Sequence, residues 1–208
     1  MYQKQPKVCG VLAVGYYVLL IAAFFAMGML YERGIENYIL LYWSLPVLAA
    51  VVVLVLDGNV RNLGLGGANI KKDLLLSGAL VVVILFAVLL LSHKPMEKLI
   101  RGAFYYLIRI AFVEELIFRG FLQNYLFGIR LKKQHLFLLG AACFSLMHVP
   151  FQMYVNHMVS LEYFLFAWPQ LLFTFGFHLI MCWITKKREN ILIPAVLHFA
   201  LDYLQAAL

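Results

Sequence analysis

The sequence predicts an all-α protein, a polytopic bundle of about seven transmembrane helices. Hydrophobic residues make up 64% of its 208 residues, against roughly 45–50% in soluble domains. Charged residues are only 13%, where about 25% is usual. The mean hydropathy is +0.89 and the mass is 23.8 kDa. A soluble protein of this size could not bury so many apolar side chains, because a small globule lacks the interior volume. The apolar residues also gather in long runs, and a helix needs about 20 of them to cross a bilayer.

Seven apolar runs each predict a membrane-spanning helix. The first is too long for the core of a signal peptide, so we treat it as a span. Pro150 interrupts the fifth run. Before the fourth run, the basic segment 94–101 predicts a short interfacial helix, since Met96, Leu99 and Ile100 fall on one side of a helical wheel. The predicted spans are residues 8–30, 38–56, 74–92, 104–127, 136–157, 163–185 and 191–208.

The spans divide the chain into two regions. Residues 1–103 form an N-terminal transmembrane region with about three spans and the interfacial segment, and residues 104–208 form a helical core that holds the polar motifs. The loop 57–73 contains NLGLGGANIKK but lacks the Gly-Lys-Ser/Thr ending of a phosphate-binding loop. It is therefore predicted to be a flexible cytoplasmic turn. Three scattered cysteines form no metal-type pair and are predicted to be packing residues, namely Cys9, Cys143 and Cys182.

The charge distribution predicts orientation and partners. The net charge of +7 would suggest nucleic acid in a soluble protein. Here cationic loops beside membrane spans explain it, and no nucleic-acid-binding motif interrupts the apolar runs. We therefore expect the lipid bilayer, and no nucleic acid, as a partner. With the N-terminus in the cytoplasm, four basic residues lie outside, which are Arg33, Lys94, Lys98 and Arg101. Eleven lie inside, which are Lys4, Lys7, Arg61, Lys71, Lys72, Arg130, Lys132, Lys133, Lys186, Lys187 and Arg188.

The first polar motif inside a span is EELIFR at residues 114–119. A charged side chain at mid-bilayer costs roughly 2.5–3.5 kcal/mol, so charged residues within a span usually have a functional or structural role. Glu115 and Arg119 are four apart, share a helix face and can pair. Glu114 lies about 100° round the helix and has no such local partner. An unpaired buried carboxylate suits proton transfer. The alternative is that all three charges form one structural network.

The second and third motifs contain histidines. FSLMH places His148 just before Pro150, and a single histidine near a span end is more often structural than catalytic. HFALD places His198 and Asp202 one turn apart in the last span, where a hydrogen bond can fix the imidazole. The alternative for that pair is a helix-stabilising contact near the outer surface.

One unpaired glutamate and two histidines from three helices can act in two ways if they converge. Glu114 can be the general base for a water that attacks a carbonyl, with imidazoles stabilising the developing charge. Alternatively, Glu114, His148 and His198 match the ligand set of a hydrolytic zinc site. The sequence leaves both open, so the cofactor is either none or a zinc ion.

These three motifs, in this order and each on its own hydrophobic helix, resemble the CPBP family of intramembrane proteases, the CAAX-protease and bacteriocin-processing group that includes Abi and Rce1-like proteins. The family motifs are E-E-x-x-x-R, F-x-x-x-H and H-x-x-x-N/D. The resemblance covers about residues 104–208. It implies that Glu114 activates water with help from His148. It further implies that Glu115, paired with Arg119, supports the site.

The resemblance also implies that His198 and the residue at Asp202 polarise the scissile carbonyl or hold its oxyanion. An asparagine there could donate a hydrogen bond to an oxyanion, whereas an ionised aspartate cannot. Asp202 is therefore expected to orient His198, to ligate a metal or to be protonated. Phe144 is expected to pack behind the site.

The function implied by the resemblance is hydrolysis of a membrane-embedded or membrane-associated peptide, with a role in peptide pheromone or bacteriocin maturation or in self-immunity. The expected location is a bacterial cell membrane. Nothing in the sequence indicates a prenylated substrate. One alternative is a non-proteolytic immunity or regulatory scaffold that binds a partner membrane protein. A proton-coupled transporter is another, disfavoured because no internal repeat is visible and the polar residues are confined to the C-terminal half.

Overall fold

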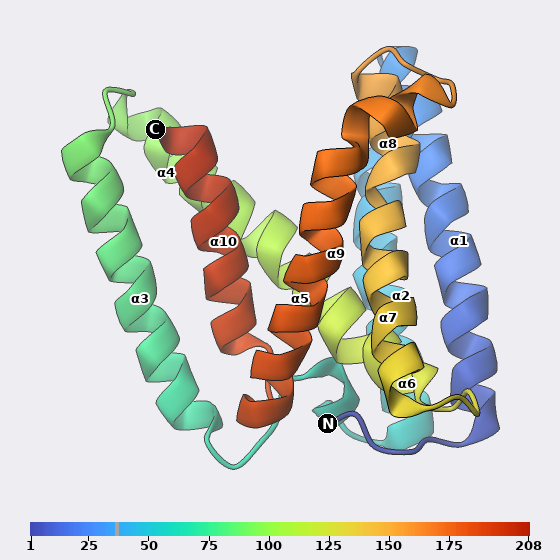
Figure 1. The fold of residues 1–208 in the computed structure, drawn as a ribbon. Coiled ribbons are helices and arrows are strands. Elements are labelled where there is room, and N and C mark those ends of the chain that lie inside the picture. Colours follow the sequence, from blue (N-terminus) through green and yellow to red (C-terminus); the bar gives the residue numbers. More distant parts are fainter. Residues whose placement is uncertain (36–37) are drawn as a thin grey trace.

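A computed structural model describes residues 1–35 and 38–208 (Figure 1). All regular structure in these ranges is helical, which confirms the predicted all-α class. The elements are α1 (Lys7–Glu32), α2 (Tyr38–Asp57), η1 (Arg61–Leu63), α3 (Ile70–Leu91), α4 (Met96–Phe104), η2 (Tyr105–Phe112), α5 (Val113–Glu115), η3 (Leu116–Leu122), α6 (Gln123–Leu126), α7 (Lys133–Leu146), α8 (His148–Val155), α9 (Glu162–Arg188) and α10 (Leu192–Ala207).

Within the part of the chain that the structure describes, five helical stretches are long and apolar enough to cross a membrane. In lipid each backbone polar group must be satisfied within its own segment, so apolar runs of this length fold as helices. The predicted count of seven spans is not confirmed, because α10 has 16 residues and the helical run 96–126 carries several charges. The five stretches are Lys7–Glu32, Tyr38–Asp57, Ile70–Leu91, Lys133–Val155 and Glu162–Arg188.

The run 96–126 is one continuous helix made of α4, η2, α5, η3 and α6. The sequence predicted a separate interfacial helix over 94–101 and a span that began at residue 104. The first helix is present from Met96, but it continues past residues 101 and 104 without a break, because no proline follows Pro95 until Pro150. We call this element the long helix. It crosses the molecule diagonally in Figure 1, and the predicted boundary between residues 103 and 104 falls inside it.

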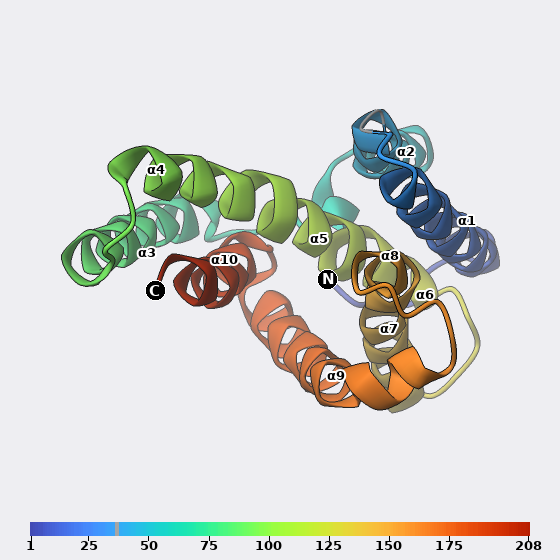
Figure 2. The ribbon, with the colours of Figure 1, turned by 90° about the horizontal axis from the view of Figure 1, so that it is seen from above.

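Two groups of helices flank the long helix. Seen from above in Figure 2, α3 and α10 lie beside its N-terminal half, while α1, α2, α7 and α8 lie beside its C-terminal half. Helix α9 packs on α7 and meets α10 at the turn near Asn190. From this turn α9 and α10 diverge, as Figure 1 shows.

The glycine-rich loop 57–73 is a packed element rather than the free turn that was predicted. Leu63 is buried against the backbone of Gly120 on the long helix. Gly64 has φ +75°, a conformation that glycine adopts without steric cost. Its carbonyl accepts a hydrogen bond of 3.0 Å from the backbone amide of Ile191. The loop therefore ties the N-terminal region to the turn that precedes α10.

Candidate active site

The two glutamates sit where the long helix changes its hydrogen bonding. The helix is π-helical over Tyr105–Phe112 and again over Leu116–Leu122, and Glu114 and Glu115 lie between these stretches. Such i→i+5 stretches are rare and are frequent at functional sites. The Glu115 side chain is fully buried, whereas the Glu114 side chain is 14% exposed. Adjacent residues thus face different surroundings, one the protein interior and the other a cavity.

The predicted pair of Glu115 and Arg119 is present in the structure. Nη1 of Arg119 lies 3.0 Å from Oε1 of Glu115, and both side chains are fully buried. The guanidinium also stacks on an aromatic ring, with its Cζ 3.9 Å from the ring centroid of Phe144. Phe144, which was expected to pack behind the site, thus contacts the pair and also lines the cavity. The pair and the ring form a rigid base beneath the ionisable groups.

His198 is the centre of the cluster. Its Nδ1 lies 2.9 Å from Oε1 of Glu115, a residue 83 positions away in the sequence. Its Nε2 lies 3.8 Å from Oε2 of Glu114 and 3.5 Å from Oδ2 of Asp202. The Glu115 carboxylate is held by Arg119 and acts as the acceptor, so Nδ1 of His198 carries a hydrogen and Nε2 faces the other two carboxylates.

His148 is fixed in a different way. It begins α8, and its Nδ1 lies 2.9 Å from the backbone carbonyl oxygen of Phe144 one turn earlier. A carbonyl oxygen can only accept a hydrogen bond, so Nδ1 carries the hydrogen and Nε2 presents its lone pair. The His148 ring also packs edge-on against the Phe144 ring at a centroid distance of 5.1 Å.

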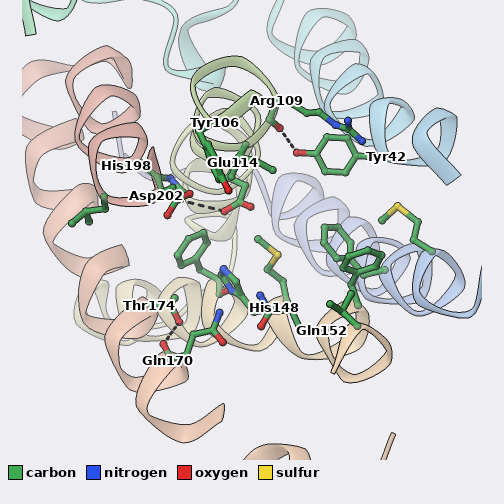
Figure 3. A pocket seen from close by; sticks show the side chains of 18 of the residues that line it. Tyr42, Tyr106, Arg109, Glu114, His148, Gln152, Gln170, Thr174, His198 and Asp202 are labelled. Atoms are coloured by element: carbon green, nitrogen blue, oxygen red, sulfur yellow. Dashed lines mark hydrogen bonds and ion pairs between the residues drawn. The ribbon is translucent and has the colours of Figure 1, made fainter. Parts of the chain in front are cut away.

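Glu114, His148, His198 and Asp202 line one cavity of about 790 Å³. Figure 3 shows Glu114 and His148 facing this cavity from opposite sides, with His198 and Asp202 beside Glu114. Glu115 and Arg119 do not line it and support His198 from behind. Oε2 of Glu114 is buried and has no hydrogen-bond partner among the described residues. The same oxygen faces His198, while the Glu114 side chain as a whole is 14% exposed and lines the cavity.

The donor set does not fit a zinc ion in this arrangement. Within residues 1–35 and 38–208, no three His, Cys, Asp or Glu side chains are grouped so that they could hold a metal. The possible ligands Glu114, His148 and His198 line the cavity, with Oε2 of Glu114 3.8 Å from Nε2 of His198. Asp202 likewise contacts His198. We derive no step through a metal.

Two groups of polar residues were missed by the sequence analysis. Behind Phe144, Nε2 of His178 lies 2.9 Å from Oε1 of Gln123, and all three side chains are buried. Two adjacent amides at Gln123 and Asn124 inside an apolar run could have signalled such a contact. Arg109 also lines the cavity, and it belongs to none of the three motifs.

Comparison with known proteins identifies the family. A family model described as type II CAAX prenyl endopeptidase Rce1-like matches residues 96–204. This stretch begins with the first residue of the long helix and includes all three motifs. No curated protein matches the chain, and no solved structure does. The match spans more than half of the chain and all of the helices that supply the cluster around His198, so the protein belongs to the type II CAAX prenyl endopeptidase Rce1-like family of membrane proteases.

Proposed function

We propose that this protein is an intramembrane endopeptidase in which water, activated by Glu114 and His148, hydrolyses a peptide bond of a membrane-embedded or membrane-associated peptide. The observation that carries the proposal is the cavity of about 790 Å³ lined by Glu114, His148 and His198. It combines a cavity-lining carboxylate with two oriented imidazoles, whose Nδ1 atoms are held by the Phe144 carbonyl oxygen and by Glu115. General acid–base groups placed in this way contribute about 10²- to 10⁴-fold to a rate.

Glu114 is the general base of this proposal. It takes a proton from a water that also donates to the Nε2 lone pair of His148, and the resulting hydroxide equivalent attacks the scissile carbonyl. Glu114 then gives the proton to the leaving amine. The two groups face the same cavity from different helices, so a water between them is held from both sides.

The role proposed for His198, with hydrogens on both ring nitrogens, is to stabilise through Nε2–H the charge that develops on the carbonyl oxygen. Glu115 orients the ring through Nδ1, and Arg119 holds Glu115. Asp202 is an acceptor rather than an amide donor, so its proposed role is to orient Nε2 of His198. Only Glu114, His148 and His198 act directly, and the other three position them.

The cavity also supports a proposal on orientation. Four of its exposed lining residues, Tyr31, Val155, Asn156 and Gln205, lie near the helix ends opposite the N-terminus, and four more, Tyr105, Gln170, Phe173 and Leu201, are exposed further along the helices. The eleven basic residues lie mainly at the other helix ends. Basic loops face the cytoplasm, so we propose that the N-terminus is cytoplasmic and that the cavity opens away from the cytoplasm of a bacterial cell. A substrate reached from that side fits an exported peptide, such as a pheromone or a bacteriocin in maturation or self-immunity.

Orientation is testable by cysteine labelling in intact cells. An Asn156→Cys variant should react with a membrane-impermeant maleimide, while Lys132→Cys should react only after the cells are permeabilised. The three native cysteines are buried and give a low background. Labelling of residue 132 but not 156 in intact cells would reverse the proposed orientation.

The function is tested by incubating the purified protein in detergent with a library of hydrophobic peptides and measuring new termini by mass spectrometry. Glu114→Gln should reduce cleavage by at least about 100-fold. Glu97→Gln is the matched control, because Glu97 is on the same long helix, is 73% exposed and pairs with Arg101. Unchanged cleavage by Glu114→Gln would refute the assigned base. Biological function that survives Glu114→Gln and His148→Ala at normal protein levels would instead favour the non-proteolytic scaffold.

A further inference from the structure

Arg109 is a cationic residue of the cavity wall that the proposed hydrolysis does not use. It lines the same cavity as Glu114 and is half-buried. No carboxylate in residues 1–35 and 38–208 forms an ion pair with it. A guanidinium in the apolar part of a membrane protein is costly without a partner, so such residues usually mark a ligand or ion path.

Two tyrosines hold Arg109 in place. Its Cζ lies 5.2 Å from the ring centroid of Tyr105 and 5.8 Å from that of Tyr42. The Tyr42 hydroxyl also donates a hydrogen bond to the Arg109 backbone carbonyl, as Figure 3 shows. Cation–π contacts of this kind orient a guanidinium without neutralising its charge. The side chain is therefore ordered and still able to bind an anion.

The charges of the cavity are unevenly distributed. Both carboxylates that line it, Glu114 and Asp202, face His198. Arg109 lies outside this cluster, so its part of the cavity is positive. The planar fork of a guanidinium matches a carboxylate with two parallel hydrogen bonds, and this match is the strongest that arginine makes with a peptide group.

We propose that Arg109 binds a carboxylate of the substrate peptide and so determines specificity. The carboxylate is either the C-terminus of the peptide or an Asp or Glu side chain. Arg109 precedes Glu114 by five residues, which is at most about 7.5 Å along the helix, because the π-helical stretch between them rises less per residue than an α-helix. An extended peptide advances about 3.3–3.6 Å per residue, so the carboxylate lies about two residues from the bond that is cut. The identification of the anion as a peptide rests on the proposed function.

Binding to three synthetic probes tests the proposal without requiring cleavage. The probes are N-acetyl-tetraleucine with a free C-terminus, the same peptide as its C-terminal amide, and an amide in which the last leucine is replaced by glutamate. Full-length Glu114→Gln protein in neutral detergent prevents turnover. At least one carboxylate probe should bind with a Kd about 10- to 100-fold lower than the tetraleucine amide. The better of the two identifies the source of the carboxylate.

The preference for a carboxylate should disappear when Arg109→Gln is added. It should remain when Arg101→Gln is added instead, since Arg101 is 80% exposed on the same helix and outside the cavity lining. Equal binding of all three probes, no binding of any probe, or a preference that survives Arg109→Gln would each overturn the proposal. Displacement of all probes by phosphatidylglycerol, without a carboxylate preference, would assign Arg109 to a lipid headgroup and would also overturn it. Carboxylate-selective binding without Glu114-dependent cleavage by the wild type would leave this inference standing and refute the hydrolase.

Discussion

Helix α3 and the C-terminal half of the long helix are both apolar helical segments, yet their surroundings differ almost completely. In α3 the buried residues are Asp73, Ser77 and Val88, and most of its leucines and valines are exposed on the surface that lipid would cover. In the long helix every residue from 115 to its end at 126 is buried. A segment that faces lipid cannot hold a polar group without a large cost, whereas a segment enclosed by protein can.

The difference explains why the most apolar segment and the segment that carries the candidate catalytic residues are different parts of the chain. The most apolar span is α3, with a mean hydropathy of 3.2. It contributes nothing to the cavity lining. The long helix is not among the five apolar stretches, because it carries the charged residues Arg109, Glu114, Glu115 and Arg119. In this protein the helix that is least typical of a membrane span carries the site.

The largest effect expected from this comparison is on stability at Arg119. Arg119→Met leaves the Glu115 carboxylate buried without its guanidinium, which should lower the free energy of unfolding by about 3–5 kcal/mol. Arg101→Met on the exposed half of the same helix breaks a surface pair of 2.7 Å with Glu97 and should cost less than about 1 kcal/mol. Unfolding in detergent followed by circular dichroism measures both. Equal losses would mean that the enclosed half is no more sensitive than the exposed half.

Matched glycine substitutions give an intermediate effect. A Cβ at Gly120 would lie 2.6 Å from the backbone carbonyl carbon of Leu63, whereas a Cβ at Gly78 on α3 would meet no atom within 4 Å. Gly120→Ala should therefore destabilise the fold by about 1–3 kcal/mol. Gly78→Ala should be neutral or stabilising by up to about 1 kcal/mol, because alanine favours a helix. Thermal unfolding of the two variants compares them, and a tolerated alanine at 120 would contradict the packed loop.

The smallest effect is expected at Asp202 and concerns activity. Its side chain is 32% exposed and lies 3.5 Å from Nε2 of His198, so Asp202→Asn should change kcat/KM by less than about fivefold. Glu115→Gln, at a fully buried position in the same cluster, should reduce it further. Initial cleavage rates of one library peptide measure both variants. A loss above about 100-fold in Asp202→Asn would show that this carboxylate takes part in the chemistry.

Local spacing accounts for the parts of the site that the sequence could predict. Glu115 and Arg119 pair because they are one turn apart on one helix, and the same holds for His198 and Asp202. The loop 57–73 could not be predicted in this way, since its contacts are with Gly120 and Ile191, far along the chain. The contact between Gln123 and His178 is likewise between helices.

The sequence by itself determined that the chain is helical and lies in a membrane, because lipid forces each apolar segment to satisfy its own backbone hydrogen bonds. It also placed the three motifs on separate helices. Only the tertiary structure decided that Nδ1 of His198 meets Glu115 and that Arg109 shares the cavity with Glu114. These contacts depend on how helix surfaces pack against one another. The hydrophobic periodicity of a single helix does not show which other helices it will contact.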